Sequence, residues 1–357
     1  MNTVTISPYD SVLFAISALE KSLKTLVSVV DKDGVLLGVV SDGDIRRALI
    51  AHFDVNTSVS EIMNTSPFYF SQGLTRAEMR KILKKNRIEA APILDDKHQV
   101  IDIFYIGDIE DGKERGGQRS QFGAAVIMAG GEGRRLRPLT DELPKPMLKV
   151  GGISIIERQV RSLAKHGIKN IFITINYCGD KISEYFKDGS SFGVSIKYVQ
   201  EEKKLGTAGA LSLISSKTFE GPILVINGDV ITTIDFNSFG YFHFSNNAKL
   251  SIAAMKYIVD VPYGVVQNHN ENVLGIVEKP SKQYLCNAGI YAIEKDLITS
   301  IPHNAFFNMT DLVQKVLSDK QKIVVFPMFE YWTDIGSKSE LEKARQQFSL
   351  NIGDIHE

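Results

Sequence analysis

From residue 122 onward, apolar and polar positions divide the chain into alternating short strands and helices. The apolar runs Ala124 to Ala129, Ile171 to Ile175 and Pro222 to Asn227 are typical of strands buried in a parallel sheet. Between the first two runs, apolar residues at helical spacing predict a helix from Ser154 to Lys165. This alternation predicts an α/β domain over residues 122–357.

Residues 1–112 carry a weaker pattern that occurs twice. Apolar residues at helical spacing from Ser11 to Leu26 precede two short strands, and the same order returns from Arg76 to Tyr105. Asp31 in the first copy corresponds to Asp95 in the second, at an offset of 64 residues. A long period that is present twice predicts a paired module rather than a solenoid.

A segment without apolar periodicity separates these two parts of the chain. Residues 111–121 read DGKERGGQRSQ, which is charged and contains glycine. This composition is typical of a linker between domains. We therefore expect a linker at residues 113–121, between an N-terminal module of residues 1–112 and a C-terminal domain of residues 122–357.

Composition narrows the classes of protein that the chain can represent. Its 357 residues, 43% of them hydrophobic, are enough for two or three domains with real cores. A net charge of −1 favours neither a nucleic-acid partner nor an anionic membrane, and no apolar run approaches the length of a membrane span. Two distant cysteines, Cys178 and Cys286, fit a reducing compartment, so we expect a cytoplasmic protein.

The segment that carries chemistry follows the first strand of the C-terminal domain and reads GGEGRRLRPLTDELPKPM, residues 130–147. Glycine lets the backbone turn tightly and bring its N–H groups against an anion, while basic side chains add fixed positive charge. The glycines are Gly130, Gly131 and Gly133, and the basic residues are Arg134, Arg135, Arg137 and Lys145. This combination suits the binding of a polyphosphate.

Two familiar phosphate-binding loops are excluded. No Gly-Lys-Ser/Thr follows the glycines, so the segment is not a Walker A loop. The dinucleotide fingerprint fails as well, because Leu136 occupies the position of its third glycine. In addition, no carboxylate ends a second strand about 20 residues further on, where that fold holds the ribose.

The N-terminal part resembles a tandem CBS-domain pair, a module that often binds adenine nucleotides. Gly38, Ser41, Asp44 and Ile45 match the Gly-x-x-Ser/Thr-x-x-Asp-Ile pattern of this family. The resemblance implies that Ser41 takes a phosphate and that Asp44 accepts hydrogen bonds from a ribose.

The second repeat departs from that pattern. Asp102 and Tyr105 stand where Gly and Ser/Thr are expected, and only Asp108 and Ile109 are retained. We therefore expect at most one adenine-nucleotide site in the pair. A dimerisation or packing module without a ligand is an equally open interpretation.

The C-terminal domain resembles the sugar-1-phosphate nucleotidyltransferases. The motifs MAGGEGRRLRPLT, PKPM, LGTAGAL, NGD, PYGVV, VEKP, NAGIY and WTDIG occur in the order found in that family. The resemblance implies a Rossmann-like, GT-A-like mixed sheet. Because CBS pairs often associate face to face, we also expect a homo-oligomer, which we take as a dimer. With the CBS pair, the match is nearest to guanylyltransferases that join GTP to glucosamine 1-phosphate for legionaminic acid, a bacterial nonulosonic sugar.

The resemblance also implies a role for each motif residue. The triphosphate is gripped by the catalytic residues Arg135 and Lys145 and by the backbone of Gly130, Gly131 and Gly133. Gly206 and Thr207 border the base, whereas Gly264, Glu278, Lys279 and Asn287 serve the sugar phosphate. Asp229 and Asp334, 105 positions apart, are the expected ligands of Mg²⁺. Arg134 and Arg137 are expected to be solvated surface charges, and Phe306, Phe307 and Phe326 to be core residues.

The reaction itself needs little acid–base help from the protein. A phosphate monoester has a second pKa of about 6, so the sugar phosphate is already a nucleophilic dianion at neutral pH. Its oxygen attacks the α-phosphorus in line and pyrophosphate leaves. Repulsion between two polyanions is the main barrier, so positioning and charge neutralisation carry the catalysis.

Several alternatives stay open. Mannose 1-phosphate, a heptose 1-phosphate or a pyrimidine nucleotide is compatible with the same motifs. A non-catalytic subunit that senses nucleotides is a hypothesis of a different class. Such subunits usually lose a signature residue, whereas Arg135, Lys145, Asp229 and Asp334 are all present here, which favours an enzyme.

Overall fold

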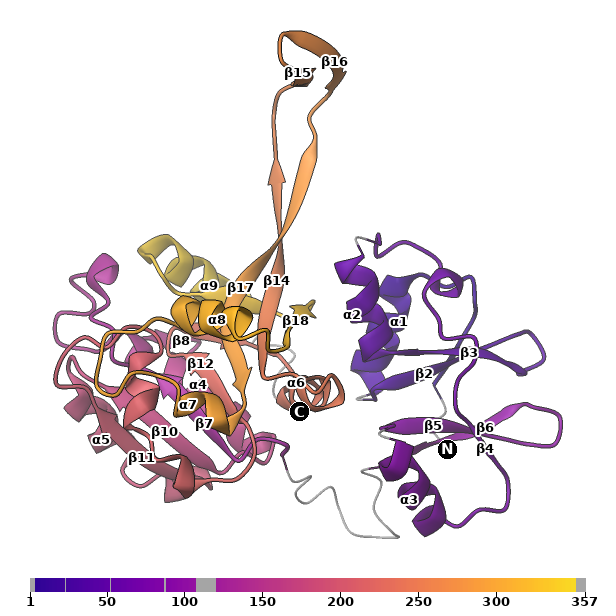
Figure 1. The fold of residues 1–357 in the computed structure, drawn as a ribbon, viewed down its shortest axis with the longest axis horizontal. Helices are drawn as coiled ribbons and strands as arrows, with labels where there is room; N and C mark the ends of the chain where they lie inside the picture. The colour runs from indigo at the N-terminus through magenta and orange to yellow at the C-terminus, as the bar shows by residue number, and fades with distance from the viewer. Residues whose placement is uncertain (1–3, 23, 52, 87, 107–119, 351–357) are drawn as a thin grey trace. The chain divides into compact units, whose positions relative to one another are not determined.

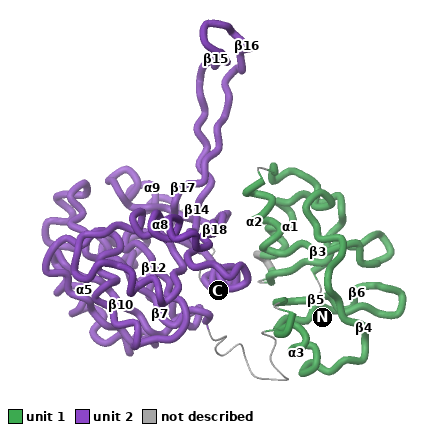
Figure 2. The backbone as a smooth tube through the Cα atoms, in the orientation of Figure 1, with its two compact units in different colours: residues 1–118 green, residues 119–357 purple. Residues whose placement is uncertain are grey.

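The computed structural model describes residues 4–22, 24–51, 53–86, 88–106 and 120–350 (Figure 1). The chain forms two compact units, residues 1–118 and 119–357 (Figure 2). Most of the predicted linker 113–121 lies outside the described residues, as do Asp108 and Ile109 of the second CBS-like motif. Within the described ranges, no helix is both long enough and apolar enough to cross a membrane.

The first unit repeats one strand–helix–strand–strand arrangement. Its elements are β1 (Thr5–Ile6), α1 (Val12–Ser22), β2 (Leu26–Val30), β3 (Leu36–Ser41), α2 (Asp42–Ile50), a 3₁₀ turn (Val59–Glu61), β4 (Phe70–Ser71), α3 (Arg76–Asn86), β5 (Ala90–Leu94) and β6 (Val100–Tyr105). They form two three-stranded sheets, in the orders β1-β2-β3 and β4-β5-β6. Elements that start at residues 12, 26 and 36 recur at 76, 90 and 100, which confirms the 64-residue repeat.

The two hairpin turns of this unit show why the aspartates recur. Asp31 accepts hydrogen bonds from the backbone N–H groups of Asp33 and Val35 at 2.9 Å, and Asp95 closes its own turn in the same way. The two turns then pair with each other through a bridge between Val35 and Gln99. The repeats are therefore one paired module.

The second unit is built on one mixed sheet. Its strands are β7 (Ala124–Met128), β8 (Lys149–Val150), β9 (Ile153–Ser154), β10 (Asn170–Ile175), β11 (Ser195–Gln200), β12 (Ile223–Asn227), β13 (Val230–Thr232), β14 (Leu250–Asp260), β15 (Val265–His269), β16 (Asn272–Val277), β17 (Ser281–Ile293), β18 (Ile323–Met328) and β19 (Trp332–Asp334). Its helices are α4 (Ile155–Lys165), α5 (Gly179–Phe186), α6 (Phe236–Ser245), α7 (Lys295–Ile298), α8 (Met309–Ser318) and α9 (Lys338–Leu350). Further 3₁₀ turns lie at Arg134–Leu136, Lys145–Met147, Ser190–Phe192, Gly209–Leu213 and Ser216–Thr218.

The seven-stranded sheet runs in the order β11-β10-β7-β12-β17-β14-β18. β11, β10, β7 and β12 are parallel, whereas β17 is antiparallel to both of its neighbours. Alternate residues of β7 enter two cores: Ala125 and Ile127 pack with α4, α5 and α6, while Ala124 and Val126 pack with α7 and α8. This three-layer arrangement is the expected Rossmann-like α/β class.

Parallel strands deliver their carboxyl ends to one edge of a sheet, and here that edge receives three polar segments. The glycine turn follows β7, Asn176 follows β10, and Asp229 follows β12, which ends at Asn227. A separate two-stranded ribbon of β13 and β19 lies beyond the end of β12. The sheet therefore gathers the motif residues of distant segments at one place.

One element differs in type from the sequence-based expectation. The segment LGTAGAL, Leu205 to Leu211, predicts the opening of an α-helix, but its last three residues begin the 3₁₀ turn Gly209–Leu213. Gly206 has a left-handed φ of 76°, and a Cβ on Gly209 would lie 2.4 Å from the carbonyl oxygen of Ala305. The small residues serve close backbone approach, and this packing leaves no room for a regular helix.

Candidate active site

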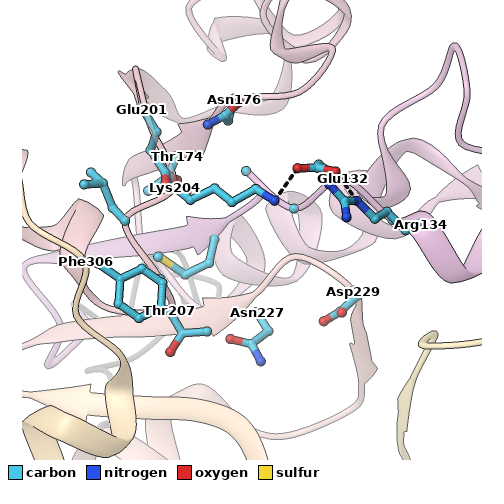
Figure 3. A pocket seen from close by; sticks show the side chains of 16 residues that line it. Glu132, Arg134, Thr174, Asn176, Glu201, Lys204, Thr207, Asn227, Asp229 and Phe306 are labelled. Atoms are coloured by element: carbon cyan, nitrogen blue, oxygen red, sulfur yellow. Dashed lines mark hydrogen bonds and ion pairs between the residues drawn. The ribbon is translucent and has the colours of Figure 1, made fainter.

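A cavity of about 500 Å³ opens at the carboxyl edge of β7, β10 and β12 (Figure 3). Six residues that the sequence singled out line it: Gly130, Gly131, Gly133, Gly206, Thr207 and Asp229. The remaining walls come from Met128, Glu132, Arg134, Thr174, Asn176, Glu201, Lys204, Leu205, Asn227 and Phe306. The glycine turn and the 201–207 segment thus face one space, as the polyphosphate interpretation requires.

Two of the three glycines are needed for close packing. A Cβ on Gly130 would lie 2.5 Å from Oε1 of Glu201, and one on Gly133 would lie 3.0 Å from side-chain atoms of Thr140 and Lys145. Gly133 also has a left-handed φ of 62°. Gly131 has nothing within 4 Å on its open side, so its backbone is exposed to a ligand in the cavity.

The two predicted metal ligands meet beside this turn. β13 and β19 pair antiparallel with Val230 opposite Asp334, and the N–H of Ile335 donates to the carbonyl oxygen of Asp229 at 3.1 Å. Lys145 lies between the two carboxylates: its Nζ donates to Oδ2 of Asp229 and lies 3.8 Å from Oδ1 of Asp334. Three motif residues that are far apart in sequence therefore form one charged cluster.

This cluster is short of positive charge. Burial, followed by repulsion from Asp229, raises the pKa of Asp334 to about 6, although Lys145 opposes the shift. Oδ1 of Asp334 is buried and has no hydrogen-bond partner among the described residues. An oxygen atom in this state fits a site that is completed by a hard cation.

Asp229 and Asp334 fit Mg²⁺ only if a bound ligand supplies further oxygen atoms. The described part of the chain has no group of three or more His, Cys, Asp or Glu placed to hold a metal. Asp229 and Asp334 are two carboxylates, and Mg²⁺ is commonly held by one or two carboxylates together with substrate phosphates and water. The pair is thus a suitable metal site once a nucleotide is bound.

Arg135 approaches the same cluster from the glycine turn. A Cβ built on Gly336 would lie 3.4 Å from Nη2 of Arg135, 3.6 Å from Oδ2 of Asp334 and 3.1 Å from Oε2 of Glu340. The Arg135 side chain is exposed and forms no ion pair within the described segments. Its guanidinium is therefore available to an incoming anion.

Glu132 was not singled out from the sequence, yet it holds two cations of the cavity wall (Figure 3). Its carboxylate pairs with Nε of Arg134 at 2.5 Å and with Nζ of Lys204 at 2.6 Å. These two partners lower the pKa of Glu132 to about 2.

Arg134 was expected to be a surface charge; it is 69% exposed but lines the cavity, whereas Arg137 pairs with Asp141 outside it.

Glu201 was also missed, because nothing in the local pattern marks a glutamate after a strand as buried. Its N–H donates to the carbonyl oxygen of Ile175 at 2.9 Å, which turns the side chain into the cavity wall beside Gly130. The residue is only 7% exposed, and this burial raises the pKa of its carboxyl group. A buried carboxylate in the wall of a cavity is a strong acceptor for paired donors.

The other wall of the cavity is fixed to α8. Oγ1 of Thr207 accepts a hydrogen bond from the N–H of Met309 at 2.8 Å, and Gly206 packs against Phe307. Phe326 is buried and Phe307 packs against the core, as expected. Phe306 was expected to be a core residue, but this was wrong: it is 64% exposed and lines the cavity, because it lies in the loop before α8.

The structure does not bring the expected sugar-phosphate residues to this cavity as a group. Gly264, Glu278 and Lys279 lie on the ribbon formed by β14 to β17, and none of them lines the cavity. Asn287, at the base of that ribbon, donates to the hydroxyl of Tyr291 at 2.6 Å. The continuous pairing of β14 with β17 keeps the PYG and VEK motifs away from the sheet edge.

In the first unit, Ser41 and Asp44 cap a helix. Oγ of Ser41 accepts from the N–H of Asp44 at 3.2 Å, and Oδ2 of Asp44 accepts from the N–H of Ser41 at 2.8 Å. Arg47 also pairs with Asp44 at 2.5 Å. Both side chains thus have structural partners, and a ligand would have to compete with them.

Comparisons with known proteins agree with this geometry. Residues 124–349 match the nucleotidyl transferase family model, and residues 1–51 and 59–111 match CBS domains. The mannose-1-phosphate guanylyltransferase of Mycobacterium tuberculosis is 32% identical over 223 residues, covering 60% of this chain and 62% of that protein. A mannose-1-phosphate guanyltransferase of Debaryomyces hansenii is 33% identical over 230 residues, with 60% and 61% covered. The chain therefore spans about 60% of the length of these curated relatives.

Two solved structures share the fold of the second unit. A putative glucose-1-phosphate thymidylyltransferase from Bacillus anthracis aligns with a TM-score of 0.52 at 26% identity, covering 63% of this chain and 94% of that one. HddC from Yersinia pseudotuberculosis aligns with a TM-score of 0.50 at 28% identity, covering 63% and 99%. With its family match over residues 124–349 and CBS domains ahead of it, the chain belongs to the nucleotidyl transferase family.

Proposed function

We propose that this protein transfers a nucleotidyl group from a nucleoside triphosphate to a sugar 1-phosphate and releases pyrophosphate. The observation that carries the proposal is the cluster of Lys145, Asp229 and Asp334, whose member Asp229 lines the glycine-lined cavity. A sensing subunit does not need two carboxylates beside a phosphate-binding turn that carry more negative charge than one lysine neutralises. A catalyst that draws two anions together does need such a pair.

Different side chains neutralise the charge of the phosphates in different ways. Lys145 and the exposed Arg135 hold phosphate oxygens, while the backbone N–H groups at Gly131 face the triphosphate. Asp229 and Asp334 would hold Mg²⁺, which supplies charge neutralisation and orients the phosphates when it is bound. Because the sugar phosphate is already dianionic, none of these residues has to remove a proton.

For the nucleotide, we propose GTP, and Glu201 is the supporting residue. Guanine presents two adjacent donors, N1–H and the N2 amino group, and a carboxylate can accept both. Cytosine, uracil and adenine do not offer this pair of donors. The buried position of Glu201, beside Gly130 and on the same cavity as Phe306, suits a purine that stacks on the aromatic ring.

For the sugar, we propose glucosamine 1-phosphate in the biosynthesis of legionaminic acid or a related surface glycan. Mannose 1-phosphate is the alternative that the names of the curated relatives favour. In either case Glu278, Lys279 and Asn287 would recognise the sugar phosphate, and Gly264 would let the backbone approach it.

We further propose that the protein is cytoplasmic and that Ser41 and Asp44 bind an adenine nucleotide at the CBS pair.

The test is a matrix of the four ribonucleoside triphosphates and dTTP against glucosamine, mannose, glucose and heptose 1-phosphates, scored by pyrophosphate release. We expect GTP to be the preferred nucleotide and Asp229→Asn to abolish turnover while its circular dichroism is unchanged. Absence of pyrophosphate with every pair in the presence of Mg²⁺ would reject an enzymatic function. Turnover by Asp229→Asn at the wild-type rate would remove Asp229 from the metal site.

A further inference from the structure

The turn that carries Asp229 is short and joins two strands at the edge of the cavity. β12 ends at Asn227 and β13 begins at Val230, so only Gly228 and Asp229 lie between them. Asn227 and Asp229 both line the cavity (Figure 3). The direction of the Asp229 carboxylate therefore depends on how this segment, which we call the 227–230 turn, is held.

Two backbone hydrogen bonds attach the middle of the 227–230 turn to its neighbours. The N–H of Gly228 donates to the carbonyl oxygen of Met128 at 2.9 Å, and a Cβ on Gly228 would lie only 2.7 Å from the same oxygen. The carbonyl oxygen of Asp229 accepts from the N–H of Ile335 at 3.1 Å. These bonds tie the turn to the end of β7 and to the end of β19. They leave the two ends of the turn to be held by other groups.

Gln159 of α4 bonds to both ends of the 227–230 turn. Its Nε2 donates to the carbonyl oxygen of Asn227 at 2.8 Å and to that of Val230 at 2.7 Å. The residue is only 4% exposed, so both bonds are shielded from water. A side-chain amide has two N–H donors, and here both of them close the same turn.

The bond to Val230 covers an edge of β13 that lacks a neighbouring strand. Within the described segments, β13 pairs with β19 alone. Successive carbonyl groups along a strand point to opposite edges, and that of Asp229 is taken by the N–H of Ile335. The carbonyl group of Val230 therefore points to the other edge, where Gln159 is its donor. A buried carbonyl group that lost this donor would be left unsatisfied.

An amide is an unusual side chain at this position of α4. Its neighbours on the helix surface are apolar and fully buried: Ile155, Ile156, Val160 and Leu163. Oε1 of Gln159 is itself buried and has no hydrogen-bond partner among the residues that the structure describes, which costs stability. Packing of the helix would be served better by another apolar residue. The two donors, and the turn that they hold, explain the glutamine.

We propose that Gln159 is a positioning residue for the metal site, because its amide sets the direction in which the 227–230 turn presents the Asp229 carboxylate. This inference rests on the proposed function, since it concerns the ion that Asp229 and Asp334 would hold. Gln159 does not line the cavity, so it acts through the backbone of the turn. Without it, the ends of the turn separate and the two carboxylates no longer face one ion. Loss of a group that orients a metal ligand typically changes metal affinity or activity 10–100-fold.

The deciding experiment compares two substitutions on the same helix. Gln159→Met keeps a side chain of similar size and removes both donors. Ser154→Ala is the matched control: Oγ of Ser154 caps α4 by accepting from the N–H of Glu157 at 3.3 Å, so its loss weakens the helix without touching the turn. The dissociation constant of Mn²⁺, a paramagnetic substitute for Mg²⁺, is measured by electron paramagnetic resonance on the full-length protein with a non-hydrolysable GTP analogue. It should rise 10–100-fold in Gln159→Met and stay within twofold of the wild type in Ser154→Ala.

Wild-type Mn²⁺ affinity in Gln159→Met would overturn the proposal, and so would an equal loss of affinity in Ser154→Ala. A wild type that binds no Mn²⁺ with the analogue would overturn it as well, since there would be no metal site to position. If the wild type binds Mn²⁺ but releases no pyrophosphate with any pair of substrates, the proposed function fails. The comparison of the two variants then still decides the role of Gln159.

A second measurement follows the turn itself and needs no metal. In hydrogen exchange of the full-length protein, Gln159→Met should speed exchange of the Gly228 and Ile335 amides at least tenfold, because both bond within or to the turn. Ser154→Ala should leave these amides at the wild-type rate. Equal rates in the two variants would reject the proposal.

A second variant covers the case in which Gln159→Met does not fold. Gln159→Glu has the shape of glutamine, and in neither of its protonation states can it donate to both carbonyl oxygens. It should therefore reproduce the loss of Mn²⁺ affinity and the faster exchange. Circular dichroism reports folding, and failure of both variants to fold would give Gln159 a purely structural role and overturn the proposal.

Discussion

Lys145 and Asp229, 84 positions apart in the chain, form an ion pair where the 3₁₀ turn at Lys145 meets the start of β13. The lysine is only 12% exposed, and its second neighbour is Asp334 at 3.8 Å. One cation thus balances two carboxylates in a partly buried place. These three side chains therefore carry an excess of negative charge.

This relationship predicts the effect of removing the lysine. Lys145→Met should lower kcat/KM about 10²–10³-fold, the range that is typical when one preorganised group that stabilises transition-state charge is lost. The matched control is Arg137→Ala, because Arg137 belongs to the same loop but pairs with Asp141. Steady-state kinetics of the two variants provide the measurement. Wild-type kinetics for Lys145→Met would show that the lysine only balances the aspartates.

Glu201 gives a prediction about the base. Glu201→Gln replaces one acceptor oxygen by a donor, so kcat/KM for GTP should fall about 10–100-fold, the discrimination of one good bidentate contact. Activity with UTP or dTTP should rise relative to GTP. Burial raises the pKa of Glu201, so this residue takes up a proton at a higher pH than an ordinary glutamate does. As the pH falls, the preference for GTP should therefore weaken at that higher pH.

The neighbouring residue supplies the control for that experiment. Glu202 is exposed and carries the same charge, so Glu202→Gln should leave nucleotide preference unchanged. The measurement is kcat/KM for each triphosphate at one sugar-phosphate concentration, repeated at two pH values. If both variants keep the wild-type preference, guanine is recognised elsewhere.

Glu132 predicts a change in KM rather than in kcat. In the free protein the Glu132 carboxylate forms ion pairs with Arg134 and Lys204. These two cations line the cavity and would also attract a triphosphate. Glu132→Gln removes this competition, so KM for the nucleotide should fall several-fold while kcat changes little. Glu142→Gln is the control, because Glu142 is an exposed carboxylate of the same loop. A higher KM for Glu132→Gln would mean that Glu132 positions the two cations for the ligand.

Much of this site could be predicted from the sequence because its parts are local. The glycine turn follows a run of buried apolar residues, and Asn227-Gly228-Asp229 follows another, so both had to reach the carboxyl edge of a parallel sheet. The contact of Asp229 with Asp334 was predicted only through the family resemblance. Its physical cause is the β13–β19 ribbon, whose strands of three residues are too short to leave a periodic pattern.

The features that were missed depend on tertiary placement. Glu201 and Glu132 sit in polar segments, where a glutamate is usually solvated, and only the approach of Gly130, Arg134 and Lys204 gives them a role. The outward direction of the ribbon of β14 to β17 was equally hidden, because apolar runs predict strands but not where a pair of strands leaves the sheet.

Finally, the buried His243 predicts a pH-dependent stability for the second unit. The residue is 1% exposed, its Nδ1 lies 2.7 Å from Oγ of Ser251, and burial lowers its pKa although Glu294, 3.3 Å from Nε2, opposes the shift. The unfolded chain therefore binds the proton more tightly than the folded one. Stability from this residue is present above a pH of about 6.5, the ordinary pKa of histidine, and is lost as the pH falls below it.

The measurement uses Trp332, the single tryptophan of the chain, whose fluorescence reports unfolding of the second unit. In urea titrations between pH 8 and pH 5, the free energy of unfolding of the wild type should fall more steeply than that of His243→Gln, which cannot take up the proton. His303→Gln, at an exposed histidine, should keep the wild-type slope. Parallel curves for the wild type and His243→Gln would mean that water or the Glu294 carboxylate stabilises a protonated His243 in the folded state.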